Sequence, residues 1–195
     1  MACTTLTSSE HEFVRQYTRS MVTMSTIATA ILATILLSAY TGQFDRILSF
    51  NNNNNESMIH LETSFKRMEY TMKHITIQLL WIILSMYWVI GHRLGTPALD
   101  PSNQREDLVW MPKNILTNTI EHGLVFIISQ LIMVIDLDSV QCCRMIPTLN
   151  YIYLIGRIAY LIGYPSKRSF GFTICNFTII LTVMFNMYQL IILYY

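Results

Sequence analysis

Charged residues along this chain are gathered into clusters that leave five long apolar stretches between them. These stretches run from Arg19 to Asp45, from Lys73 to His92, from Lys113 to Asp136, from Arg144 to Lys167 and from Arg168 to Tyr195. Each holds about 18 to 27 residues, and a helix that rises about 1.5 Å per residue needs about 20 to cross a hydrocarbon core about 30 Å thick. The pattern therefore predicts five transmembrane helices.

The apolar stretches lack the polar face that a helix of a soluble bundle turns to water. Residues Ile27 to Ser38 and Ile75 to Ile90 are apolar or weakly polar on all sides. The composition agrees, because 52% of the residues are hydrophobic and 13% are charged, whereas about a quarter are charged in ordinary soluble domains. We therefore expect an all-α integral membrane protein rather than a soluble bundle.

The regions around the apolar stretches set the predicted division of the chain. Residues 1–19 form an N-terminal segment, 20–42 an extra transmembrane helix, 43–73 a flexible loop and 74–195 a four-helix domain. Arg15 and Arg19 precede the first helix as in a signal peptide, but its apolar run is too long for one, so we expect a signal anchor. The loop carries the run Asn51 to Asn55, which offers nothing to bury, and its last part, residues 58–73, could form a short surface helix.

Two features predict that the 43–73 loop lies in the lumen of the secretory pathway. Basic residues are slightly more numerous on the side of the N-terminus, and the positive-inside rule places that side in the cytosol. The sequon Asn55-Glu56-Ser57 can be glycosylated only in the lumen. We therefore expect a glycoprotein of the endoplasmic reticulum or of later secretory membranes.

Three ionisable residues, Glu121, His122 and Arg157, interrupt the apolar stretches. A charge at bilayer depth costs about 2.5 to 3.5 kcal/mol on insertion scales, so such groups normally face the bundle and pair. Glu121 and Arg157 each lie about seven residues from the same membrane surface, so we expect them to be level and to form an ion pair. We expect His122, one position off that face, to be packed or hydrogen-bonded rather than to bind a metal.

Further polar residues recur at helical spacing around the expected pair. The two sets are Asn114, Asn118 and Glu121 on one helix, and Tyr153, Arg157, Tyr160 and Tyr164 on the next. Each set occupies one helix face. From the depths of these residues we expect Asn118 to lie level with Tyr160, and Asn114 with Tyr164, so that the two faces form a polar ladder.

This polar ladder leaves two interpretations open. In the first, it is a structural network that fixes the packing of the helices. In the second, it is a charged cleft, open to the cytosol and extended by Lys167 and Arg168, that binds an anionic amphipathic ligand. A net charge of +1 without a basic stripe argues against nucleic-acid binding. The four scattered cysteines spell out neither a metal cluster nor a disulfide framework.

The ladder residues also carry a resemblance to a known family. The two motifs are Asn118-x-x-Glu121 on one helix and Arg157-x-x-Tyr160-x-x-Gly163-Tyr164 on the next. Together they resemble the signature of the membrane-associated proteins in eicosanoid and glutathione metabolism, the MAPEG superfamily, over about residues 75 to 195. The extra leading helix and the segments Lys167 to Phe172 and Met184 to Tyr188 are most similar to the mattrin branch, that of transmembrane protein 79.

This resemblance implies a homotrimer in which residues 74–195 form a MAPEG-like four-helix bundle. In the enzymatic members, glutathione binds between neighbouring subunits and reacts with a hydrophobic small molecule. The residues that match its binding set here are Asn118, Glu121, Arg157, Tyr160 and Tyr164. An arginine near the surface stabilises the glutathione thiolate in those enzymes, and Arg168 is the first candidate for that role here, with Arg93 the second. Lys167 adds a cation for a glutathione carboxylate.

Some residues depart from the enzymatic pattern, and two functions therefore remain open. Asn114 stands where enzymatic members commonly carry an arginine, and His122 follows the motif glutamate. The chain is either a glutathione transferase or peroxidase acting on a hydrophobic substrate, or a non-enzymatic mattrin-like regulator or scaffold of secretory membranes. No motif of another enzyme class occurs, and a single buried ion pair gives little support to a channel.

Overall fold

The structure, a computed structural model, is all-helical in the part of the chain that it describes, which contains no strand. It describes residues 61, 63–94, 96–99 and 106–194, with isolated helical positions between residues 19 and 34. The long helices are α4 (Ser64–Arg93), α5 (Trp110–Asp136), α6 (Ser139–Gly163) and α7 (Ser169–Tyr194), and the 3-10 helices η1 (Pro97–Leu99) and η3 (Glu106–Val109) connect α4 to α5. Most of the predicted leading helix at 20–42, and the sequon at Asn55, lie outside the described residues.

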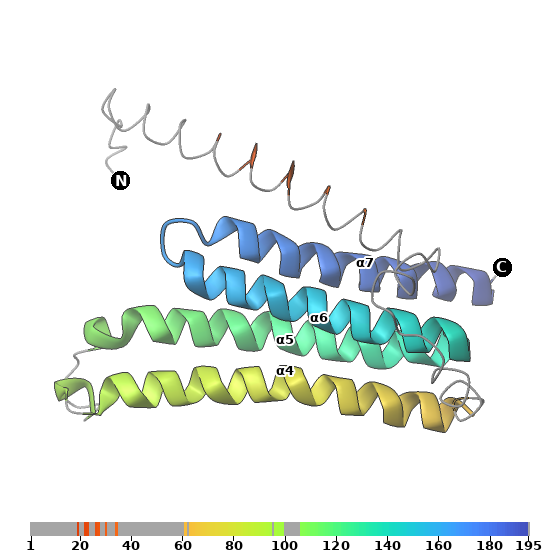
Figure 1. Ribbon diagram of the computed structural model, residues 1–195, viewed down its shortest axis with the longest axis horizontal. Coiled ribbons are helices and arrows are strands. Elements are labelled where there is room, and N and C mark those ends of the chain that lie inside the picture. The colour runs from red at the N-terminus through yellow and green to blue at the C-terminus, as the bar shows by residue number, and fades with distance from the viewer. Residues whose placement is uncertain are drawn as a thin grey trace, which may run out of the picture.

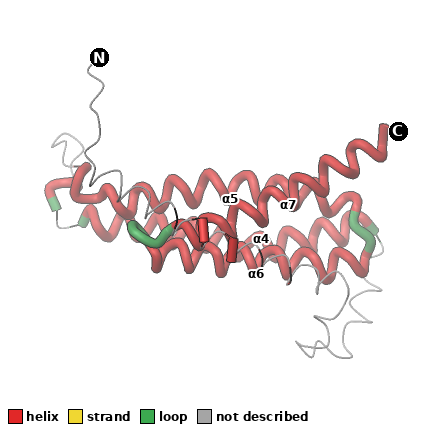
Figure 2. Tube along the Cα trace, turned by 90° about the horizontal axis from the view of Figure 1, so that it is seen from above, coloured by secondary structure: helices red, strands yellow, loops and turns green. Residues whose placement is uncertain are grey.

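Consecutive long helices run antiparallel and form a bundle (Figure 1). Helix α5 packs against α4 and α7, and α6 packs against α7 and α4, so α5 and α6 lie across a diagonal of the bundle. From above, α5 and α7 lie on one side and α4 and α6 on the other (Figure 2). The most extensive contacts join α4 to α5 and α6 to α7, so the bundle consists of two helical hairpins.

The four long helices have the length and the surface of membrane-spanning helices. They contain 25 to 30 residues, and a helix of that length measures about 38 to 45 Å, more than the thickness of a hydrocarbon core. Large apolar side chains point outward, among them Leu124, Ile162 and Leu193. The prediction of an all-α chain is confirmed for this part, and its four long helices are long and apolar enough to cross a membrane.

Helix α4 begins earlier than the sequence indicates. Residues from Ser64 onward are helical and continuous with the predicted spanning segment, so the flexible loop expected to residue 73 is wrong over 64–73. The helix expected within residues 58–73 is present from Ser64, but as the first turns of α4 rather than as a short helix. The first turns carry charged residues, which the apolar pattern does not count as part of a span. Thr71 in these turns is nevertheless fully buried, and the exposed pair of Lys73 with Glu69, one turn away at 2.7 Å, adds a small helix-stabilising contact.

Helices α6 and α7 approach each other closely where two glycines meet. A Cβ atom added to Gly156 would lie 2.8 Å from the Sγ atom of Cys175 on α7. A Cβ atom added to Gly171 would lie 2.5 Å from the carbonyl oxygen of Gly156 and closer still to the backbone nitrogen of Tyr160. Small residues permit this approach of two backbones, which is a common form of helix packing in membranes.

We expect Gly171→Ala to destabilise the protein by about 1 to 3 kcal/mol or more, because the backbone atoms that the new methyl group meets cannot move aside. Gly91→Ala is the control, since no atom lies within 4 Å of a Cβ at that position. Unfolding of both variants in detergent micelles, followed by circular dichroism, measures the difference. Equal stability of the two variants would contradict the close approach of α6 to α7.

Candidate functional site

The buried guanidinium group of Arg157 is the centre of the polar ladder. Arg157 on α6 is 1% exposed. Its Nη1 atom donates to Oδ1 of Asn118 on α5 at 2.8 Å, and Nη2 donates to the backbone oxygen of Asn118 at 3.2 Å. Its Nε and Nη2 atoms donate to the hydroxyl oxygen of Tyr153 at 3.0 and 2.9 Å. Arg157 therefore crosses the diagonal of the bundle and joins the two hairpins.

Aromatic rings complete the surroundings of this guanidinium group. Its central carbon lies 5.1 Å from the ring centre of Tyr153 and 5.9 Å from that of Tyr160, within the range of cation–π attraction. The ring of Tyr153 stacks on Phe126 of α5 with centres 4.2 Å apart. The charge is thus stabilised by neutral oxygens and ring faces.

The expected ion pair between Glu121 and Arg157 is wrong. Glu121 is exposed on the surface of the bundle, and the described residues offer it neither an ion pair nor a hydrogen bond. The buried face of α5 contains Thr119, Gly123 and Phe126, and Asn118 lies at its edge. Three residues cover about 300° of a 3.6-residue helix, so Glu121 is turned about 60° further outward than Asn118. The similar distance of Glu121 and Arg157 from one end of the bundle does not mean that their side chains point toward each other.

Toward the α6–α7 turn, one of the two predicted pairs of the ladder is formed and the other is not. Nδ2 of Asn114 donates to the hydroxyl oxygen of Tyr164 at 3.4 Å, which confirms that these two residues are level. Asn118, however, bonds Arg157 rather than Tyr160. The rings of Tyr160 and Tyr164 meet edge to face, with centres 5.7 Å apart.

The candidate cations for a thiolate lie at this same end of the bundle but in different surroundings. The guanidinium carbon of Arg168 lies 5.6 Å from the ring centre of Tyr164, and both Arg168 and Lys167 are exposed. Arg93, in contrast, is held by Glu106 of η3, with Nη2 and Oε1 3.0 Å apart, and Lys113 pairs with the same carboxylate. The structure therefore brings Arg168, and not Arg93, next to the ladder.

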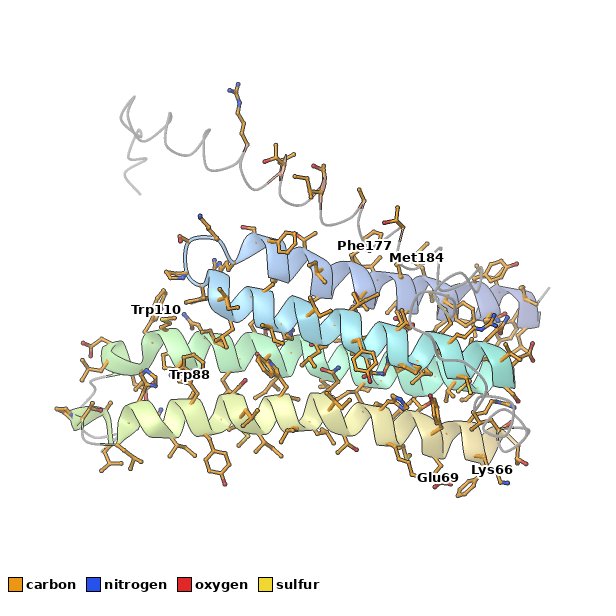
Figure 3. All side chains as sticks on the ribbon, viewed as in Figure 1. Lys66, Glu69, Trp88, Trp110, Phe177 and Met184 are labelled. Carbon is orange, nitrogen blue, oxygen red and sulfur yellow. The ribbon has the colours of Figure 1, made fainter. Side chains whose placement is uncertain are left out.

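Two of the three tryptophans lie at this end of the bundle. Trp88 and Trp110 lie at one end, and Lys66 and Glu69 at the other (Figure 3). The ring of Trp110 packs against Tyr164, with centres 6.1 Å apart. Tryptophan is enriched where a membrane meets water, so this end of the ladder has the composition of a membrane boundary.

The ladder residues of α6 are buried in the part of the chain that the structure describes, and they line no open cleft there. Arg157, Tyr160 and Tyr164 are 1%, 3% and 7% exposed. A shallow hollow lies elsewhere, on the outer side of α4, where Trp88, Gly91 and His92 contribute to its lining. His122 is packed against Phe172 with ring centres 5.0 Å apart, and no group of three metal-ligating side chains occurs in residues that the structure describes.

A second buried polar cluster, made of amides, escaped the sequence analysis. Nε2 of Gln78 on α4 donates to both oxygens of Asn150 on α6, at 3.0 and 3.2 Å, and Nδ2 of Asn150 donates to Oε1 of Gln130 on α5 at 3.1 Å. All three residues are at most 2% exposed. Uncharged amides do not interrupt an apolar stretch as a charge does, and only their common depth in three helices would have indicated the cluster.

Comparison of the chain with protein-family models, with curated proteins and with solved structures found no match. The resemblance to the MAPEG superfamily stays a prediction from the motifs of the ladder.

Double-mutant cycles test the partners of Arg157. We expect Asn118→Ala and Arg157→Met to be coupled by about 0.5 to 3 kcal/mol, because each removes the same hydrogen bonds. Glu121→Gln is the matched control and should add independently to Arg157→Met, since its carboxylate faces away. Stability measured by thermal unfolding in micelles gives both coupling energies. Coupling to Glu121 with none to Asn118 would restore the ion pair.

The amide cluster makes a separate prediction. Asn150→Leu keeps the branched shape of the side chain but leaves Gln78 and Gln130 without a side-chain partner, so we expect a loss of about 1 to 3 kcal/mol. Single interhelical hydrogen bonds in membranes average about 0.6 kcal/mol, and two are removed here. Asn176→Leu is the control, because Asn176 on α7 makes no hydrogen bond within the described residues. A loss of stability in Asn150→Leu no greater than in Asn176→Leu would contradict the stabilising role of the amide cluster.

Proposed function

We propose that this protein is a non-enzymatic membrane bundle that acts as a scaffold or regulator in membranes of the secretory pathway. The observation that supports this proposal is the satisfaction of Arg157 within its own chain, by Asn118 and Tyr153. A ligand that used this guanidinium group would have to replace four hydrogen bonds and to displace the tyrosines that cover it. The polar ladder therefore serves to align the two hairpins, as in the first interpretation.

The charges of the bundle agree with this proposal. A buried arginine with neutral partners keeps its stabilising role only while the helices stay packed, because an exposed arginine in lipid is unfavourable. Such a network specifies one arrangement of helices more than it adds stability. The outer surface of the bundle is then the part that is free to contact other membrane components.

A second candidate function, glutathione binding with transferase or peroxidase activity on a hydrophobic substrate, is favoured by one observation. Arg168 covers Tyr164 at the end of the ladder, and exposed Lys167 is beside it. Two neighbouring cations suit the two carboxylates of glutathione, and a neighbouring subunit of a homotrimer would have to complete the site. In that case Arg168 lowers the pKa of the bound thiol by its charge.

The compartment is part of the same proposal. The endoplasmic reticulum or a later secretory membrane follows from the sequon at Asn55 and from the distribution of basic residues. The segment around Asn55 that precedes α4 is then lumenal, and the end with Lys167 and Arg168 is cytosolic.

Calorimetry with glutathione separates the two functions. We expect no saturable heat from the detergent-purified protein at millimolar glutathione, because the ladder is closed. Arg168→Ala and Lys66→Ala serve as a matched pair, since Lys66 is an exposed cation at the opposite end. Saturable binding that is lost in Arg168→Ala and kept in Lys66→Ala would overturn the non-enzymatic proposal and establish the second candidate.

A further inference from the structure

Glu121 is an exposed acidic residue at membrane depth. It lies eleven residues after Trp110, which begins α5, and this corresponds to about 16 Å along a helix about 40 Å long. The side chains around it on α5 are apolar and exposed, with Ile120 at 42%, Leu124 at 58% and Ile128 at 50%. The carboxyl group therefore points into the hydrocarbon region.

Exposure of this carboxyl group to lipid is unfavourable in either protonation state. The charged form loses its hydration, and the neutral form still lacks partners for its hydroxyl group and its carbonyl oxygen. The described residues of the chain supply no partner to Glu121. Thr117, one turn before it, is also exposed and adds a hydroxyl group to the same face. Polar groups of this kind associate transmembrane helices when a complementary group is present.

We propose that the outer face of α5, defined by Thr117, Glu121, Leu124 and Ile128, docks a transmembrane helix of another protein that carries a lysine or arginine at this depth. The docked cation pairs with Glu121, and the apolar residues beside it pack against Leu124 and Ile128. This inference rests on the proposed scaffold function and names the chemistry of its partner.

Charge complementarity favours another protein over a second copy of this chain. In the described residues from α4 to α7, the exposed cations lie toward the two ends of the bundle: Lys66, Lys73, Lys113, Lys167 and Arg168. The cation of these helices near the depth of Glu121 is Arg157, which is enclosed and bonded within its own chain. Helices α4 to α7 of a second copy thus present no free cation to the carboxylate at this depth.

A defined peptide tests the proposal. The full-length protein is reconstituted in phosphatidylcholine vesicles with a labelled leucine-alanine transmembrane peptide that carries one central lysine. Energy transfer to a label on the protein reports association. We expect the lysine peptide to bind about tenfold more tightly than the same peptide with leucine in place of lysine. Glu121→Gln should abolish most of this difference, whereas Asp136→Asn, which removes an exposed carboxylate at the end of the same helix, should keep it.

The alternatives give different readings in the same vesicles. Equal binding of the two peptides, or lysine-dependent binding that persists in Glu121→Leu, overturns the inference. So does energy transfer between differently labelled copies of the protein that is lost in Glu121→Leu, because a second copy then covers this face. Circular dichroism confirms that each variant is folded. Glutathione calorimetry is independent of the peptide, so failure of the docking face and failure of the scaffold proposal are told apart.

Discussion

The guanidinium group of Arg157 lies inside a bundle that surrounds it with neutral oxygens and aromatic rings and, in the described part, with no carboxylate. A charge in such a place is tolerated only when nearly every donor has an acceptor. Asn118 supplies two acceptors, one from its side chain and one from its backbone, and Tyr153 supplies a third. These bonds fix both the depth and the rotation of α6 relative to α5, which direct packing between those two diagonal helices does not.

The rest of the bundle is consistent with this constraint. Tyr153 is held in place by its stack on Phe126, and the close glycine contact at Gly156 lies one residue before Arg157. About two turns earlier on α6, Asn150 repeats the same arrangement with amides in place of a charge. The buried polar groups bond to one another inside an otherwise apolar interior, because lipid cannot supply hydrogen bonds, and the outward-facing side chains are largely apolar as well.

The sequence allows prediction of which segments are helical and of which residues on different helices lie level. It does not allow prediction of the direction in which a side chain points around its helix. The apolar gaps gave the four long helices, and counting residues from the membrane surface placed Asn114 level with Tyr164, as their hydrogen bond confirms. The same counting assigned Glu121 to Arg157, because a lone acid and a lone base at equal depth suggest a pair. Which face of α5 is buried depends on packing against α4 and α7, and the nearly uniform hydropathy around that helix carries no such information. The amides Gln78 and Gln130 were not predicted for a related reason. They carry no charge, so they do not interrupt the apolar stretches from which the helices were predicted.

The diagonal placement of α5 and α6 has a consequence for biogenesis. Helices α4 and α5, and likewise α6 and α7, can associate as soon as each pair has left the ribosome and entered the bilayer. The bonds from Arg157 to Asn118 join one pair to the other, so they form only after both pairs are present. Until then the arginine keeps its bonds to Tyr153 on its own helix, while its Nη1 atom has no acceptor within the α6–α7 pair. The last two hydrogen bonds of this one side chain are therefore made only when the two hairpins come together.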